Sequence, residues 1–186
     1  MKVNGNAIKP GYIIEHNGGL WRAVKTEHTQ PGKGGAYLQV ELKNIRDGSK
    51  LNERFRAAES VDRVQLELRP FQYLFGDDDN LTFMNTENYE QVTVARELAG
   101  EQVVFLQDGM SVEIEFYEDE PLSLRMPDKV TLEVAQTEPV VRGQTAANSN
   151  KPAILENGVR VSVPPFIGIG DRVIVNTETF SYSERA

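Results

Sequence analysis

Apolar and polar residues alternate in short runs along most of this chain, which predicts β-strands rather than long helices. In the first third, the alternating or β-branched runs are residues 12–15, 20–24, 37–42 and 63–68. Turn sequences rich in glycine, asparagine, proline or aspartate separate them at residues 17–19, 31–35 and 47–49. Short strands joined by tight turns are typical of a small antiparallel barrel. The first third therefore predicts an SH3-like barrel.

Short strands continue through the rest of the chain. We expect them over residues 71–75, 81–85, 103–107 and 111–117 in the middle third, and over residues 130–136, 153–155, 160–163 and 171–176 in the last third. Residues 87–98 are less regular, and periodicity leaves a short helix open over residues 92–98. Both thirds predict five-stranded barrels of the OB type. The expected fold is all-β, with domains over residues 1–64, 65–127 and 128–186.

Charge is distributed unevenly over these thirds. The chain carries 20 Lys and Arg against 28 Asp and Glu, a net charge of −8, which taken alone argues against nucleic-acid binding. Residues 1–64 nevertheless carry +4, residues 65–128 carry −12 and residues 129–186 are neutral. The acidic middle is either a solvated surface or a face for basic ribosomal or other proteins, and we expect no phosphate contact there.

Several kinds of chemistry are disfavoured. The chain has no cysteine, which excludes disulfides, thiolate metal sites and thiol nucleophiles. His16 and His28 lack the spacing of metal ligands, so we expect surface-loop positions for both and no metal site. Residues 77–80 lack the alternating ligands of a calcium loop and predict a solvated turn. Neither a Gly-x-Ser-x-Gly elbow nor a complete Walker loop is present, so we do not expect an enzyme.

Nothing in the sequence indicates a membrane or secretion signal. The N-terminal residues lack an apolar signal core, and no run approaches the ~18 apolar residues of a membrane helix. We therefore expect a soluble, cytoplasmic protein.

The loop Pro31-Gly32-Lys33-Gly34-Gly35 holds one lysine between glycines. Proline fixes one φ angle and glycine permits positive φ, so the chain can reverse tightly with the lysine projecting from the tip. A projecting amine suits RNA contact or covalent modification; the alternative is a solubilising residue at a hairpin tip. Residues 143–150 are similarly either an ordinary inter-strand loop or a surface that approaches a nucleic-acid strand.

Three stretches of the chain resemble bacterial elongation factor P. Residues 151–171, which read KPAILENGVRVSVPPFIGIGD, are similar to the C-terminal signature of that family in their Lys, Ala, Gly, Val-Pro, Phe-Ile and Gly-acid positions. Residues 83–91, FMNTENYEQ, resemble its middle-domain motif, and residues 31–37, PGKGGAY, resemble its functional loop. The resemblance extends over the entire chain. Lys33 indicates the lysine-bearing branch rather than the arginine-bearing, rhamnosylated one.

This resemblance implies a translation elongation factor, with an N-terminal SH3/KOW-like domain and two OB folds in an L-shaped, tRNA-like arrangement. It implies binding to the 70S ribosome between the peptidyl and exit sites, with contacts to ribosomal RNA, peptidyl-tRNA and the mRNA in the exit site. The implied activity is relief of stalling at consecutive prolines. It also implies a ligase that attaches a β-lysyl group to Lys33, no other cofactor and a monomer.

The resemblance also implies RNA contacts in the last domain, at Gly143, Gln144, Thr145, Ala146, Tyr182 and Arg185. Gln144 stands where the family usually has aspartate or asparagine, which weakens the expectation of messenger contact. Glu178 stands where the family has arginine and removes a phosphate-binding charge. The alternative to a ribosomal factor is a general RNA-binding or RNA-chaperone protein with the same barrels, and dependence on polyproline sequences separates the two.

Overall fold

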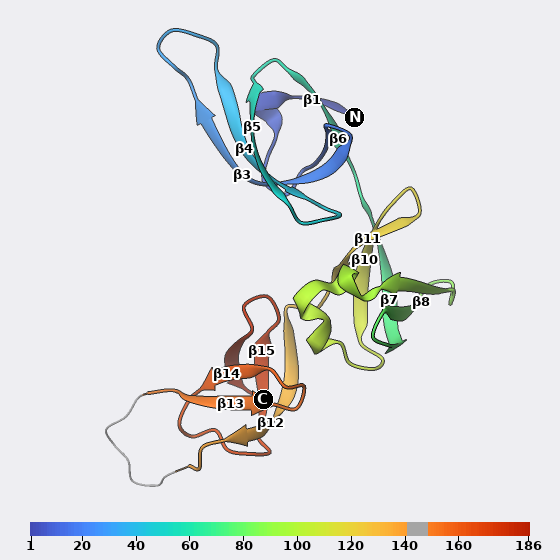
Figure 1. Ribbon diagram of the computed structural model, residues 1–186, viewed down its shortest axis with the longest axis vertical. Coiled ribbons are helices and arrows are strands. Elements are labelled where there is room, and N and C mark those ends of the chain that lie inside the picture. The colour runs from blue at the N-terminus through green and yellow to red at the C-terminus, as the bar shows by residue number, and fades with distance from the viewer. Residues whose placement is uncertain (141–148) are drawn as a thin grey trace. The chain divides into compact units, whose positions relative to one another are not determined.

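The structure, a computed structural model, describes residues 1–140 and 149–186 (Figure 1). The first six strands are β1 (Lys2–Asn4), β2 (Ile13–His16), β3 (Gly19–Thr29), β4 (Tyr37–Asn44), β5 (Lys50–Arg56) and β6 (Ser60–Val64), with a 3₁₀ turn η1 at Gly5–Ala7. The next are β7 (Glu67–Gly76), β8 (Asn80–Asn85), β9 (Gln91–Ala95), β10 (Ser111–Tyr117) and β11 (Glu120–Arg125), with η2 at Arg96–Phe105. The last are β12 (Lys129–Thr137), β13 (Lys151–Leu155), β14 (Arg160–Val163), β15 (Arg172–Asn176) and β16 (Ser181–Arg185). The expected all-β class is confirmed.

The strands form three sheets within two compact units. The first unit comprises Met1–Leu68 and Glu115–Ser123, and the second comprises Arg69–Ile114 and Leu124–Ala186. The sheet orders are β1-β6-β2-β3-β4-β5, then β11-β10-β7-β8-β9, then β14-β13-β12-β15-β16. The domain bounds expected from the sequence stay a prediction.

The sheet of the first unit follows from the alternating pattern of its strands. In β4, Leu38, Val40 and Leu42 are fully buried, whereas Gln39 between them is exposed. Successive side chains of a strand point to opposite faces, so alternation places one apolar face inward. The core that results contains Ile8, Ile14, Ala23, Leu38, Val40, Leu42, Phe55 and Val61.

The tip of the β10–β11 hairpin belongs to this first unit although it lies far along the chain. Leu122 packs with Ile13 and Leu20 in a small apolar cluster. Beside it, the Arg22 guanidinium donates hydrogen bonds to both carboxylate oxygens of Glu115, at 3.0 and 3.3 Å, and Glu115 is only 5% exposed. A buried carboxylate needs such a partner, because an unpaired buried charge is strongly destabilising.

The second unit contains a C-terminal sheet with a well-developed core. Its buried residues come from β12 to β15 and the loop before β15, and they include Val134, Leu155, Val163, Ile167, Val173 and Val175. Phe105 of η2 is fully buried in this same cluster, and its ring lies 5.0 Å from that of Phe180, centroid to centroid. The segment before β10 therefore contributes to the C-terminal core.

This packing explains why the strand expected over residues 103–107 is wrong. Residues up to Phe105 are in η2, and Gly100 interrupts that segment with φ 59° and ψ −148°, outside the helical region. An apolar run such as Val103-Val104-Phe105 suits a strand or a buried helical turn equally well, and burial of Phe105 in the C-terminal core is what selects the turn. The helix left open over residues 92–98 is replaced by β9, followed by η2.

Two smaller expectations are also corrected, and one is confirmed. The expected strand over residues 63–68 is divided between β6 and β7, because the chain passes there from one sheet to the next. His16 and His28 lie on strands rather than in loops, and His16 Nε2 is 3.1 Å from Glu53 Oε2. Residues 77–80 form the expected exposed turn, in which N–H groups of Asp79 and Asn80 donate to Asp77 and lower the pKa of its carboxyl.

The helical parts of the chain are short. Within the described residues, no helix is long and apolar enough to cross a membrane.

Candidate functional site: the Lys33 loop

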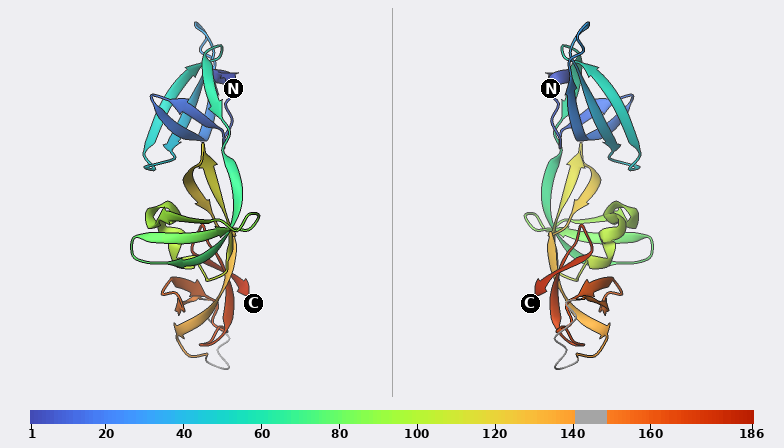
Figure 2. Two further views of the ribbon diagram at one scale, coloured as in Figure 1. Left: turned by 90° about the vertical axis from the view of Figure 1, so that its right-hand side faces the viewer. Right: turned by 90° about the vertical axis from the view of Figure 1, so that its left-hand side faces the viewer.

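The strands on either side of the Lys33 loop are long and closely paired. β3 and β4 are antiparallel, and their last paired residues before the loop are Thr29 and Tyr37. A bulge lies between Ala23 and Lys25, and bulges increase the local twist of a strand. The loop between Thr29 and Tyr37 extends beyond the barrel, which Figures 1 and 2 show from three directions.

Every residue from Gln30 to Ala36 is exposed. Of the three glycines in the loop, only Gly34 has positive φ, at +142°. A Cβ atom on Gly34 would lie 3.6 Å from the Pro31 ring, so the loop folds back on itself, whereas Gly32 and Gly35 have open space around them. The expected tight reversal is present, and Gly34 is the glycine that it requires.

Lys33 lies at this tip with its side chain accessible. Within residues 1–140 and 149–186, no hydrogen bond or ion pair involves its ammonium group. A lysine that acts as an amine nucleophile is typically desolvated in a pocket, and the open loop offers no such environment. The geometry instead leaves the ammonium group available to a partner or to an acylating enzyme.

A ring contact and a backbone hydrogen bond hold the base of the loop in place. The Arg54 guanidinium lies over the Tyr37 ring, 4.2 Å from its centroid, a cation–π geometry. The backbone N–H of Ala57 donates to the carbonyl of Ala36 at 3.1 Å. A cavity of about 190 Å³ lies at this base and is lined by Asn6, His28, Thr29, Gln30, Ala36, Tyr37 and Ala57. The loop thus projects from a packed polar base.

The candidate RNA contacts of the last third that the structure describes lie in the second unit, whereas Lys33 lies in the first. Tyr182 and Arg185 both lie on β16. The Tyr182 side chain is partly buried against the C-terminal core. The guanidinium Nη2 of Arg185 lies 3.6 Å from Asp171 Oδ1. Glu178 is exposed in the turn between β15 and β16, where Asn176 Oδ1 accepts its N–H. Gly143, Gln144, Thr145 and Ala146 lie outside the described residues.

The stretch over residues 151–171 has a structural explanation. Lys151 is buried, and its ammonium group donates a 2.7 Å hydrogen bond to the carbonyl of Glu138. Ile167 is fully buried, and the N–H of Gly168 donates to Asp171 Oδ2 at 2.9 Å. Most of this stretch therefore builds the C-terminal barrel rather than presenting reactive groups.

Sequence reasoning missed two features of the structure. One is the Arg22–Glu115 contact, whose partners lie 93 residues apart; no local pattern could have indicated it. The other is a cleft of about 540 Å³ between β7, β10 and the segment that follows β11. For metals, the described residues contain no group of three or more histidine or acidic side chains placed to hold an ion.

Comparison with known proteins matches every third of the chain to one family. Residues 4–61 match the family model described as the elongation factor P KOW-like domain, residues 66–124 match its OB domain, and residues 130–185 match "Elongation factor P, C-terminal". Elongation factor P of Ruegeria sp. (strain TM1040) is 60% identical over 185 residues, covering 100% of this chain and 99% of the relative. That of Brucella abortus (strain S19) is 58% identical over 186 residues, covering both chains completely.

A solved structure supports the fold. The eukaryotic translation initiation factor 5A from Methanococcus jannaschii has a TM-score of 0.55 and 23% identity, covering 66% of this chain and 88% of that one. At that identity the likeness concerns the fold alone. Together with the three family models, it confirms the KOW-like N-terminal domain and the OB type.

Proposed function

Because this chain belongs to the elongation factor P family of translation elongation factors, we propose that it binds the ribosome between the peptidyl and exit sites and relieves stalling at consecutive prolines. Lys33 is the residue through which it acts. The observation that carries this proposal is the exposed, unpaired Lys33 at the tip of a projecting loop with a packed base. That geometry allows the amine to enter a narrow RNA-lined space ahead of the rest of its barrel.

The proposed mechanism is positioning of substrates. The nitrogen of proline is a constrained secondary amine, so peptide-bond formation suffers when the reacting groups are poorly oriented. Ordering the peptidyl-tRNA restores a productive geometry, and such ordering accelerates a reaction without any chemical group from the factor. In this mechanism the factor contributes contacts and the ribosome performs the chemistry.

We also propose that the chain belongs to the lysine-bearing branch of the family, which the presence of Lys33 in the loop supports. We propose that a dedicated ligase attaches a β-lysyl group to Lys33. The ligase activates the β-lysine carboxyl group with a nucleoside triphosphate, and the neutral Nζ of Lys33 then attacks the carbonyl carbon, so that the amide bond forms as the nucleotide and one proton leave. The longer arm keeps a positive charge and gains hydrogen-bond donors that reach phosphate and ribose oxygens of the tRNA end. The open space around Gly32 and Gly35 leaves room for an enzyme to approach the loop.

RNA contacts of the C-terminal barrel complete the proposal. Tyr182 and Arg185 lie on one strand, β16, and the exposed guanidinium of Arg185 can exchange its long 3.6 Å contact with Asp171 for a phosphate. Glu178 would repel a phosphate from the neighbouring turn. We therefore expect weaker backbone contact at that turn than at β16, and messenger contact at residues 143–146 stays a prediction.

A translation assay with two reporters tests the function. One reporter encodes three consecutive prolines and the other replaces them with alanines, in a ribosomal system that lacks the endogenous factor. The chain purified from its native host should raise synthesis of the proline reporter alone. Lys33→Ala should remove this stimulation, whereas Lys50→Ala, which removes another exposed lysine of the same barrel, should retain it. Equal stimulation of both reporters would favour a general RNA chaperone.

The state of Lys33 is tested separately by intact mass and a tryptic map of the same preparation. An added lysyl mass on the peptide that contains Lys33 is the expected result. An unmodified Lys33 in an active preparation would contradict the modified arm and leave a factor that works with a bare lysine.

A further inference from the structure

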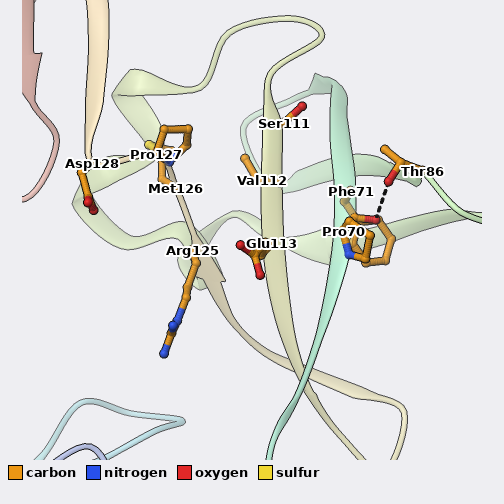
Figure 3. Close-up of a pocket in the computed structure, with 10 residues that line it drawn as sticks. All are labelled: Pro70, Phe71, Thr86, Ser111, Val112, Glu113, Arg125, Met126, Pro127 and Asp128. Atoms are coloured by element: carbon orange, nitrogen blue, oxygen red, sulfur yellow. Dashed lines mark hydrogen bonds between the residues drawn. The ribbon is translucent and has the colours of Figure 1, made fainter.

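The cleft of the second unit lies at the connection between β11 and β12 (Figure 3). One wall consists of Arg125, Met126, Pro127 and Asp128, which leave β11. The other consists of Ser111, Val112 and Glu113 of β10, with Pro70, Phe71 and Thr86 beyond them. Its volume of about 540 Å³ falls in the range of ordinary ligand sites.

Hydrogen bonds hold both walls in place. Thr177 is fully buried, and its hydroxyl and N–H donate to the carbonyls of Pro127 and Asp128, at 2.7 and 2.8 Å. Across the cleft, Thr86 donates to the carbonyl of Pro70 through its N–H and its hydroxyl, at 3.1 and 3.4 Å; Figure 3 shows the hydroxyl contact. A site whose walls are already fixed binds a ligand with little loss of entropy.

The polar groups in the cleft indicate the sign of the charge on the ligand that it binds. Glu113 and Asp128 line it from opposite walls, and both side chains are exposed. Within residues 1–140 and 149–186, neither carboxylate forms a hydrogen bond or an ion pair. Arg125 also lines the cleft, and its side chain points away from Glu113 (Figure 3). The second unit's part of this stretch, residues 69–114 and 124–128, carries three Arg against ten Asp and Glu, a charge of −7, so the field favours a cation and disfavours nucleic-acid phosphates.

The apolar groups indicate that this cation has a long aliphatic stem. Met126 and Pro127 present hydrocarbon surface next to Asp128, and Pro70 and Phe71 line the cleft on the far side of Glu113 (Figure 3). Lysine and arginine pack their aliphatic stems along such surface while the charged head remains with polar partners. A small inorganic cation would leave this surface unused.

We propose that this cleft binds a segment of a basic protein, with one arginine or lysine side chain inserted between Glu113 and Asp128. The stem of the inserted residue lies against Met126 and Pro127, and its head forms charge-assisted hydrogen bonds with the two carboxylates. This protein-binding site is independent of Lys33 and goes beyond the proposed function.

The test is an amide NMR titration of the full chain with a blocked peptide, acetyl-Gly-Arg-Gly-amide. Saturable shifts should be confined to the cleft, at residues such as Ser111, Glu113 and Asp128. Citrulline in place of arginine should abolish them. An analogue with the guanidinium on a single methylene should bind several-fold more weakly, because its stem cannot cover the apolar wall.

Matched variants separate the cleft from the general acidity of the unit. Glu113→Gln combined with Asp128→Asn should weaken binding about tenfold or more. Asp78→Asn combined with Glu101→Gln removes two exposed acids outside the cleft and should leave binding unchanged. Thermal unfolding checks that both double variants are folded.

Three outcomes would overturn the proposal. The first is the absence of saturable shifts at the cleft with the arginine peptide. The second is equal weakening by the two double variants, which would mean diffuse electrostatic attraction. The third is a uridine oligonucleotide that shifts the cleft residues where the peptide does not, which would make the cleft an RNA site.

Discussion

Lys33 is exposed at the tip of the β3–β4 loop and has no bonded partner among the described residues, whereas Lys151 is buried at the start of β13 and donates to the carbonyl of Glu138. Both lysines stand in stretches that carry the family resemblance. Their environments show that the two stretches resemble the family for different physical reasons. The Lys33 loop leaves an amine exposed to solvent, and the Lys151 stretch builds the C-terminal barrel.

This comparison can be tested through stability, because buried groups contribute to it and exposed ones contribute little. The largest effect is expected at Phe105, which extends the buried C-terminal core from outside the last third. Phe105→Ala should destabilise the second unit by about 3–5 kcal/mol, the usual range for deleting a buried phenyl ring. Urea unfolding followed by far-ultraviolet circular dichroism measures this loss of stability. Val104→Ala, at a neighbouring side chain that is 39% exposed, is the control and should cost well under 1 kcal/mol.

The second effect is expected at the buried lysine itself. Lys151→Met keeps the aliphatic stem and removes the hydrogen bond to Glu138, which should cost about 1–2 kcal/mol. Lys129→Met makes the same change at the exposed first residue of β12 and should be nearly neutral. If both variants unfolded at the same urea concentration as the unsubstituted chain, Lys151 would not have the structural role assigned to it.

The third effect lies in the Lys33 loop, at a glycine rather than at the lysine. Gly34→Ala places a Cβ atom on a residue with φ +142° and should destabilise the first unit by about 1 kcal/mol. Gly35→Ala is the control, because Gly35 has open space and no positive φ. Denaturant midpoints of the two variants give the difference, and a larger loss at Gly35 would contradict the backbone argument.

The smallest effect is expected at Lys33. Lys33→Ala removes no described contact, so the free energy of unfolding should stay within about 0.5 kcal/mol of the unsubstituted chain. The same preparation should nevertheless fail in the proline reporter assay. If Lys33→Ala lowered the free energy of unfolding as much as Lys151→Met does, the contrast between an exposed and a structural lysine would be wrong.

Local patterns predicted much of the architecture. Alternation in residues 37–42 identified β4, and the Asp77–Asn80 turn followed from residues that hydrogen-bond their own backbone. The Lys33 loop was also predictable, because a proline and three glycines between two alternating runs encode a reversal within a few residues. In each case the interactions that decide the structure lie close together in the sequence.

Other elements were decided at long range. The apolar run that ends at Phe105 forms a helical turn because the Phe105 ring is buried in the C-terminal core. Residues 63–68 are divided between β6 and β7 because the chain passes there from one sheet to the next. The Arg22–Glu115 pair and the cleft lined by Glu113 and Asp128 join residues from segments with unrelated local patterns. No periodicity within either segment contains that information.

By itself, then, the sequence determined the all-β class, the strands with clean alternation and the exposed lysine between glycines, since side-chain period and backbone freedom are local properties of the chain. The tertiary structure alone decided that Lys151 is buried, that Phe105 completes a distant core, that the β10–β11 tip joins the first unit and that two unpaired carboxylates face one cleft. The physical reason is that burial and pairing depend on which surfaces meet when the sheets close, and that is a property of the whole packed unit.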